Sequence, residues 1–154
     1  MTTISNTDDV IDSRDVIERI EELEGERQDL QDAFETAVDN ELQNTDPEQR
    51  ETLNTVRNDA YKALTDWDEE NKAELDALKA LAEEAEGYAP DWRHGAALVR
   101  DSYFEDYARE LLEDIGDIPR NLPHYIEIDW EATARNIQMD YTAVDFDGVS
   151  YWVR

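Results

Sequence analysis

The chain has 154 residues, of which 41 are Asp or Glu and 14 are Lys or Arg, so its formal net charge is −27. This sign opposes direct binding to nucleic acid or anionic lipid and favours a partner with a basic surface. The absence of cysteine excludes disulfides, thiolate zinc sites and thiol nucleophiles, and fits a reducing compartment.

Disorder and adaptation to high salt are two simpler explanations of the acidity. Low hydrophobicity with high net charge is typical of disorder, but 40% of the residues are apolar and 4 Trp, 7 Tyr and 3 Phe are present, so we expect a fold. Salt adaptation stays open because lysine is scarce, with only Lys62, Lys72 and Lys79. Self-repulsion destabilises compact monomers and favours a thin shape and a second subunit.

Targeting signals are not apparent. No apolar run approaches the ~20 residues that cross a bilayer. The polar start Met1–Asn6 does not resemble a signal peptide. We therefore expect a cytoplasmic protein.

The first element in chain order is a long helix. Residues 1 to about 10 predict a loose acidic start, after which Ser13 can cap a helix running to about Asn44. Apolar residues recur at steps of three and four, interrupted by one arginine, as in a coiled-coil stripe. The stripe comprises Val16, Ile20, Leu23, Arg27, Leu30, Phe34 and Ala37. Because it is narrow, carboxylates occupy most of the remaining helix surface.

A second helix should follow antiparallel to the first. Asp46 and Pro47 indicate a helix start, because Asp is a good cap and proline fits the first turn. Asp66 with Glu69 resembles a capping box and predicts a break or kink before a third helix that ends near Gly87. The expected apolar positions are Leu53, Val56, Ala60, Ala63, Leu64, Trp67, Leu75, Leu78, Leu81, Ala82 and Ala85.

The remaining residues predict a smaller unit. Residues 88–92 are rich in aromatic side chains and should dock rather than form a flexible linker. Ser102 with Glu105 predicts a capping box for a helix ending at Gly116. The inner face of that helix would carry Phe104, Tyr107, Ala108, Leu111 and Ile115.

The C-terminal residues predict a short helix and a β-hairpin. Asp129 can cap a helix that ends about Tyr141 and places Trp130, Ala134 and Ile137 on one side. Residues 142–154 then alternate in period two around the dipeptide Asp147-Gly148, which is a hairpin signal.

These elements together define the expected fold class. It is α+β and mainly helical. A long acidic N-terminal helical hairpin with coiled-coil character spans residues 1–87, and a small helical unit with a C-terminal β-hairpin spans residues 88–154.

Catalytic chemistry has little support in the sequence. His94 and His124 are the only histidines, so no paired-histidine metal motif exists, and the five glycines form no phosphate-binding loop. Residues 145–148 resemble the start of a calcium loop but lack the downstream oxygen ligands. We expect no enzyme activity, no metal and no cofactor.

The carboxylates themselves are the candidate site. Acidic residues three or four apart on a helix lie about 5–6 Å from each other, similar to neighbouring phosphates. The uncompensated charge equals that of about 46 Å of duplex DNA. The candidate phosphate-mimicking residues are Glu18, Glu21, Glu22, Glu26, Asp29, Asp32, Glu35, Asp39, Glu105, Asp106, Glu110, Glu113, Asp114 and Asp117.

Part of the chain resembles a known family. Ser102–Gly116, Tyr125–Arg135 and Met139–Tyr141 resemble the C-terminal part of ArdA-type antirestriction proteins. The antirestriction motif of that family joins leucines, an Asp, a Pro and a terminal Tyr-aromatic-Asp, although Ile126 stands here in place of the aromatic residue. Its matching residues here are Asp117, Pro119, Leu122, Tyr125 and Asp129. The resemblance covers the C-terminal third.

The resemblance implies an anti-defence function. Members of that family are acidic DNA mimics of phages and mobile elements that occupy the DNA-binding groove of type I restriction–modification enzymes. By analogy this chain would inhibit such an enzyme in the host cytoplasm as a homodimer, with Pro119, Leu122, Tyr125 and Asp129 near a dimer contact. A CRISPR effector is another possible target. The alternative function is an acidic helical scaffold, with adaptation to high salt as one explanation of its charge, whose hairpin seam binds a partner coiled coil.

Overall fold

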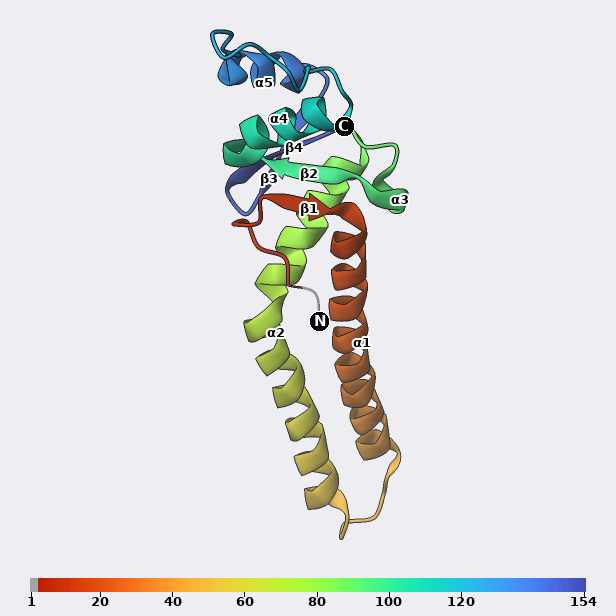
Figure 1. Ribbon diagram of the computed structural model, residues 1–154. Helices are drawn as coiled ribbons and strands as arrows, with labels where there is room; N and C mark the ends of the chain where they lie inside the picture. The colour runs from red at the N-terminus through yellow and green to blue at the C-terminus, as the bar shows by residue number, and fades with distance from the viewer. Residues whose placement is uncertain (1–2) are drawn as a thin grey trace. The chain divides into compact units, whose positions relative to one another are not determined.

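The computed structural model describes residues 3–154 and confirms an α+β, mainly helical fold (Figure 1). The chain divides into two compact units: the hairpin unit, residues 19–78, and the sheet unit, which joins the described residues up to Glu18 with residues 79–154. The domain boundary expected at residue 87 stays a prediction. The elements in order are β1 (Val10–Asp12), α1 (Ser13–Gln43), α2 (Arg50–Glu86), α3 (Trp92–Gly95), β2 (Ala97–Arg100), η1 (Asp101–Tyr103), α4 (Phe104–Asp114), α5 (Trp130–Gln138), β3 (Thr142–Phe146) and β4 (Val149–Val153).

The hairpin unit consists of α1 and α2, which run in opposite directions (Figure 1). Their cross-helix contacts show the antiparallel register, because Glu26 meets Trp67 and, further along α1, Phe34 meets the earlier Tyr61 with ring centroids 5.5 Å apart. Leu23 and Ala37 of the predicted stripe are buried. The long first helix and its seam are therefore confirmed.

The kink expected near Asp66 is wrong, because α2 is one continuous helix from Arg50 to Glu86. The Asp66 carboxylate pairs with Lys62 one turn earlier instead of capping a new helix. Leu64 and Trp67 are buried, so the apolar stripe continues through the expected break.

Two details of α2 also differ from the sequence-based expectation. The apolar pattern predicts Val56 and Ala63 in the buried stripe, but both are exposed. The side chain of Asp46 accepts a hydrogen bond from the Glu48 N–H at 3.0 Å, in a turn that precedes the helix. The helix therefore begins four residues after the predicted cap.

The sheet unit contains an antiparallel four-stranded sheet in the order β1-β2-β4-β3. The predicted hairpin of β3 and β4 is confirmed. Its turn places Asp147 at φ 48° and Gly148 at φ 83°, the left-handed pair that an Asp-Gly hairpin turn requires. The loose start expected over residues 1–10 is corrected by β1 and by a turn at residues 5–8, while residues 1 and 2 lie outside the described part.

Ser13 does not cap α1 as predicted. The Asp12 carboxylate accepts the Arg14 N–H at 2.8 Å and thereby takes the capping position. The buried Ser13 hydroxyl instead donates to the carbonyl of Trp92 at 2.6 Å and accepts from the N–H of Ala96 at 2.7 Å. Ala89 and Trp92 are buried, so this part of the aromatic connection docks as expected, whereas the Tyr88 ring is 53% exposed.

Helices α4 and α5 pack against each other through a small core that also receives β2. This core consists of Val99, Phe104, Ala108 and Ala134. The predicted cap of α5 is confirmed, because the Asp129 carboxylate accepts the Ala132 N–H at 3.0 Å.

The predicted start and end of α4 are both corrected. Ser102 lies in the 3-10 turn η1, where its hydroxyl accepts from Arg100 rather than capping α4. Ile115 was expected on the inner face of α4, yet it is 59% exposed. It lies just beyond the last residue of the helix.

Candidate partner-binding surface

Three of the four arginines of the hairpin unit bind carboxylates across the seam between its two helices. Arg19 is only 6% exposed, and its guanidinium contacts the Glu74 carboxylate through Nε at 2.8 Å and Nη2 at 3.2 Å. Its Nη1 donates to Glu22 at 3.1 Å. These bonds, with that to Glu74 the strongest, raise the pKa of Arg19 and keep its charge inside the hairpin.

Two further arginines repeat this arrangement along the seam. Arg27 donates to both carboxylate oxygens of Asp68, at 2.8 and 3.2 Å, and this hydrogen bonding raises the pKa of Arg27. Nearer the turn, Arg57 pairs with Glu41 at 2.9 Å. Each of these arginines is therefore paired with a carboxylate of the other helix.

On the outward face of α1 in the hairpin unit, the charged side chains are all acidic. Residues 19–43 contain nine acidic residues and no cations other than Arg19 and Arg27. The predicted candidates Glu21, Asp29, Asp32, Glu35 and Asp39 are all exposed on this helix. The corresponding part of α2, residues 50–78, contains four cations among eight acidic residues and presents mixed charge.

Four of the α1 carboxylates follow one another at phosphate-like intervals. Asp29, Asp32, Glu35 and Asp39 are separated by steps of three, three and four residues, which keeps them on one side of the helix. They span about 15 Å along the axis. A single DNA strand carries about four phosphates over that distance. We call these four residues the acidic row.

Two members of the acidic row contact nearby amides. Gln28 donates to Asp32 and Gln31 donates to Glu35, both at 2.8 Å. Each bond joins residues four apart on the same exposed face. The amides are neutral, so the charge of the row is unchanged.

Two other predicted candidates on α1, Glu22 and Glu26, have structural contacts. Glu22 is half-buried against Arg19, and Glu26 accepts a hydrogen bond from the indole N–H of Trp67 at 3.0 Å. Glu18 is exposed and belongs to the sheet unit. Glu22 and Glu26 therefore also hold the hairpin together.

The sheet unit contributes a second group of exposed carboxylates. Glu110 lies 3.3 Å from the Tyr103 hydroxyl, which donates to it. Burial, then the charge of Glu110, raises the pKa of Tyr103. The exposed candidates here are Glu105, Asp106, Glu110, Glu113, Asp114 and Asp117.

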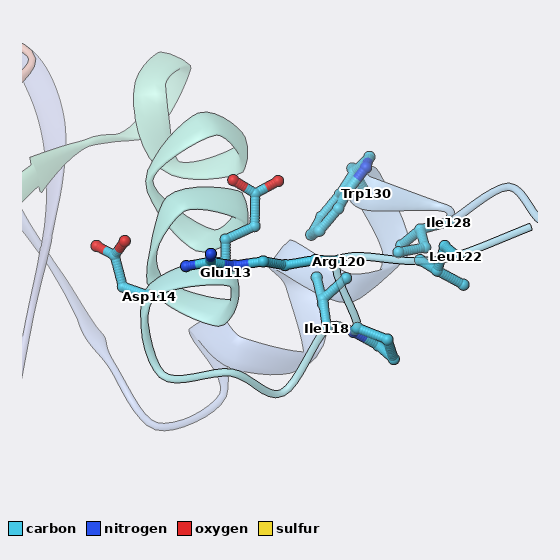
Figure 2. A pocket seen from close by; sticks show the side chains of 8 residues that line it. Glu113, Asp114, Ile118, Arg120, Leu122, Ile128 and Trp130 are labelled. Atoms are coloured by element: carbon cyan, nitrogen blue, oxygen red, sulfur yellow. The ribbon is translucent and has the colours of Figure 1, made fainter. Parts of the chain in front are cut away.

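The residues predicted to match the antirestriction motif lie in the loop between α4 and α5. Pro119 and Leu122 line a hollow of about 570 Å³, shown in Figure 2, whereas Tyr125 is 76% exposed. Asp129 caps α5 and so has a structural role. The motif residues are thus divided between a cavity wall, a helix cap and the surface.

Arg109 and Trp130 form a contact that sequence reasoning missed. The Arg109 guanidinium lies 5.0 Å from the centroid of the Trp130 ring, and its Nε is buried without a hydrogen-bond partner. Arginine over an indole is a cation–π contact. The two residues are 21 positions apart on different helices, so no local spacing signals the pair.

Residues 3–154 hold neither a cluster of metal ligands nor a membrane-spanning helix. No group of three or more His, Asp or Glu side chains there is placed to bind an ion. No helix in the same range is long and apolar enough to cross a bilayer.

Comparison with known proteins identifies the family. The family model described as antirestriction protein (ArdA) matches residues 3–149, so the relationship extends well beyond the C-terminal third and includes the hairpin unit. No curated protein and no solved structure matches the chain. Because the family match covers nearly all of the sequence, this chain belongs to the ArdA family of antirestriction proteins.

Proposed function

We propose that this chain inhibits a restriction–modification enzyme by occupying the basic groove in which that enzyme binds DNA. The carboxylates of the acidic row would stand where phosphates of one strand otherwise lie. The observation that carries the proposal is the separation of charge in the hairpin unit. Arg19 and Arg27 are bound to carboxylates at the seam, while the charged side chains on the outward face of α1 within residues 19–43 are all acidic.

This separation gives α1 a property of DNA that net charge alone does not provide. A surface of mixed charge makes both attractive and repulsive contacts with a basic groove, so its net attraction to the groove is weak. A row of like charges at regular intervals instead meets the several cations of a DNA-binding groove together. Binding of this kind steers association and depends steeply on salt.

The remaining details extend the proposal. We infer that the target is a type I restriction–modification enzyme, that the chain comes from a phage or mobile element, and that it acts as a homodimer in the host cytoplasm. A CRISPR effector is the second target to be tested, because it also holds nucleic acid in a basic channel. Inhibition is stoichiometric and involves no catalysis.

A competition assay with a purified type I enzyme tests the proposal. The variant with Glu21→Gln, Asp29→Asn and Asp39→Asn removes three exposed charges that form no ion pair within residues 3–154. At about 0.5 kcal/mol per lost contact, the concentration for half-inhibition should rise roughly tenfold. Inhibition by the unmodified chain should weaken as salt is raised.

A matched triple variant on α2 separates arrangement from total charge. Asp59→Asn, Glu69→Gln and Glu70→Gln remove the same number of exposed charges from the face with mixed charge. This control should inhibit nearly as well as the unmodified chain. Equal losses from both triples would show that only net charge matters, and inhibition that does not change with salt would overturn the proposal.

The scaffold function is the second candidate, and one observation favours it. Val56 and Tyr61 of α2 are 50% and 55% exposed, which leaves apolar surface for a partner helix. A partner held this way would bind through apolar contacts, so the α1 triple variant would bind it unchanged. If the α1 triple variant still binds the helical partner, the scaffold function is supported. If it no longer inhibits the restriction enzyme, the DNA-mimic function is supported.

A further inference from the structure

The hollow beside the loop between α4 and α5 combines an apolar wall with an acidic rim. Ile118, Leu122 and Ile128 form part of the wall together with Trp130, and Glu113 lies at the rim on α4 (Figure 2). Asp114 is next to Glu113 and also lines the hollow. Its volume of about 570 Å³ lies within the range of sites that hold small ligands or side chains.

The acidic rim has no cation bound to it within residues 3–154. Neither Glu113 nor Asp114 forms an ion pair there, and both are exposed. Arg120 lines the same hollow and extends from the loop toward this end of α4 in Figure 2, yet it makes no ion pair with either carboxylate. A guanidinium therefore lies near the rim without being held.

The chemistry of the hollow fits one kind of side chain. An aliphatic stem packs well on isoleucine, leucine and indole surfaces, while a cationic head prefers carboxylates at the edge. Arginine combines both parts, and its planar guanidinium binds carboxylates bidentately. Arg109 already contacts the Trp130 ring with its guanidinium, which shows that this indole accepts such a group.

We propose that this hollow receives an arginine side chain from the DNA-binding groove of the partner. The inference rests on the proposed function, because that function supplies a partner rich in basic residues. The net charge of −27 attracts such a side chain and repels acidic ones. Arg120 competes for the same position and moves aside when the partner arginine enters.

The test uses N-acetyl-arginine amide as the probe and the full chain as the receptor. Binding is followed by NMR through the indole N–H signal of Trp130. The apolar analogue N-acetyl-norleucine amide has a similar stem but no guanidinium. We expect the arginine probe to shift the Trp130 signal in a saturable manner and the norleucine probe to have a much smaller effect.

Three variants locate the probe. Glu113→Gln with Asp114→Asn should weaken binding of the arginine probe roughly three- to tenfold, because two favourable charge contacts are lost. Glu69→Gln with Glu70→Gln is the matched control on the hairpin unit and should leave binding unchanged. Arg120→Ala should strengthen binding, because it removes the competing guanidinium.

The outcomes separate this inference from the proposed function. Equal shifts with both probes, or no effect of the Glu113 and Asp114 substitutions, would overturn the arginine site. Sedimentation tests a second copy of the chain as the occupant: a dimer that dissociates with these substitutions, without arginine binding, also overturns it. In either case salt-dependent inhibition of the restriction enzyme would persist, so the proposed function would stand.

Discussion

At the scale of single residues, Arg19 is the best example of a charge used for structure rather than for the surface. Its side chain is almost fully buried and contacts carboxylates on both helices. The sequence alone placed Arg27 in the stripe but gave no role to Arg19. The reason is that Arg19 precedes Ile20, so a one-residue shift in periodicity decides which of them faces α2.

Replacing Arg19 should destabilise the hairpin. Arg19→Met keeps much of the side-chain volume but leaves Glu74 and Glu22 without their cation, and we expect a loss of about 1–3 kcal/mol in the free energy of unfolding. Arg19→Lys should recover part of this loss, because lysine keeps the charge but not the bidentate contact. Urea denaturation measures both.

The exposed pair of Arg135 and Glu131 serves as the control for Arg19. Their side chains are 63% and 79% exposed. Arg135→Met should therefore change the free energy of unfolding by less than about 0.5 kcal/mol. Equal effects of the two Arg→Met substitutions would contradict the structural role of Arg19.

Asp12 gives a pH-dependent prediction at the start of α1. A hydrogen bond from Arg14 lowers the pKa of Asp12 below its ordinary value of 3.8. The ionised carboxylate thus favours the folded state above the unfolded pKa, and this contribution is lost as pH falls through the folded pKa. In an NMR titration, Arg14→Gln should raise the pKa of Asp12 toward 3.8. An unchanged value would mean that the Arg14 side chain is not the cause.

At the scale of elements, segments with a repeating pattern or a defined turn signal were predictable, and the short strands β1 and β2 were not. The α1 stripe and the Asp147-Gly148 turn were identified because each repeats or uses a signal with a defined backbone geometry. Strands β1 and β2 are three and four residues long, too short for a period of two to stand out. Their pairing joins segments about 90 residues apart, which local patterns do not encode.

Part of the candidate surface could likewise be predicted from the sequence, and part could not. The exposed carboxylates of α1 followed from helix periodicity, because residues outside a narrow stripe face solvent. The engagement of Glu26 by Trp67 did not follow, since it depends on the register between two helices. The hollow beside Trp130 was equally unpredictable, because its wall comes from a loop without periodicity.

Replacing two glycines by alanine should have opposite effects on the stability of the protein. Gly25 lies inside α1, and the space that a Cβ would occupy there is open, so Gly25→Ala should stabilise the protein by up to about 1 kcal/mol. Gly148 has φ +83° in the β3–β4 turn, so Gly148→Ala should destabilise it by about 1 kcal/mol. In thermal unfolding, the melting temperature should rise for Gly25→Ala and fall for Gly148→Ala. A stabilising Gly148→Ala would contradict the turn geometry.

At the scale of the whole molecule, the same ions should act on stability and on binding with opposite signs. A net charge of −27 makes the folded chain repel itself, and added salt screens that repulsion. The salt also screens the attraction to a basic groove, so it weakens inhibition. The melting temperature should therefore rise with sodium chloride over the range in which inhibition falls.

The Glu21→Gln, Asp29→Asn and Asp39→Asn variant tests whether one set of charges causes both effects. Removing three exposed negative charges lowers self-repulsion, so this variant should melt higher than the unmodified chain at low salt and gain less from added salt. It should also inhibit less. Thermal scans and competition assays at matched salt concentrations measure the two responses. If its melting temperature were lower at low salt, the carboxylates on the outward face of α1 would stabilise the fold. They would then not be the source of the charge repulsion that this prediction assigns to a phosphate-mimicking surface.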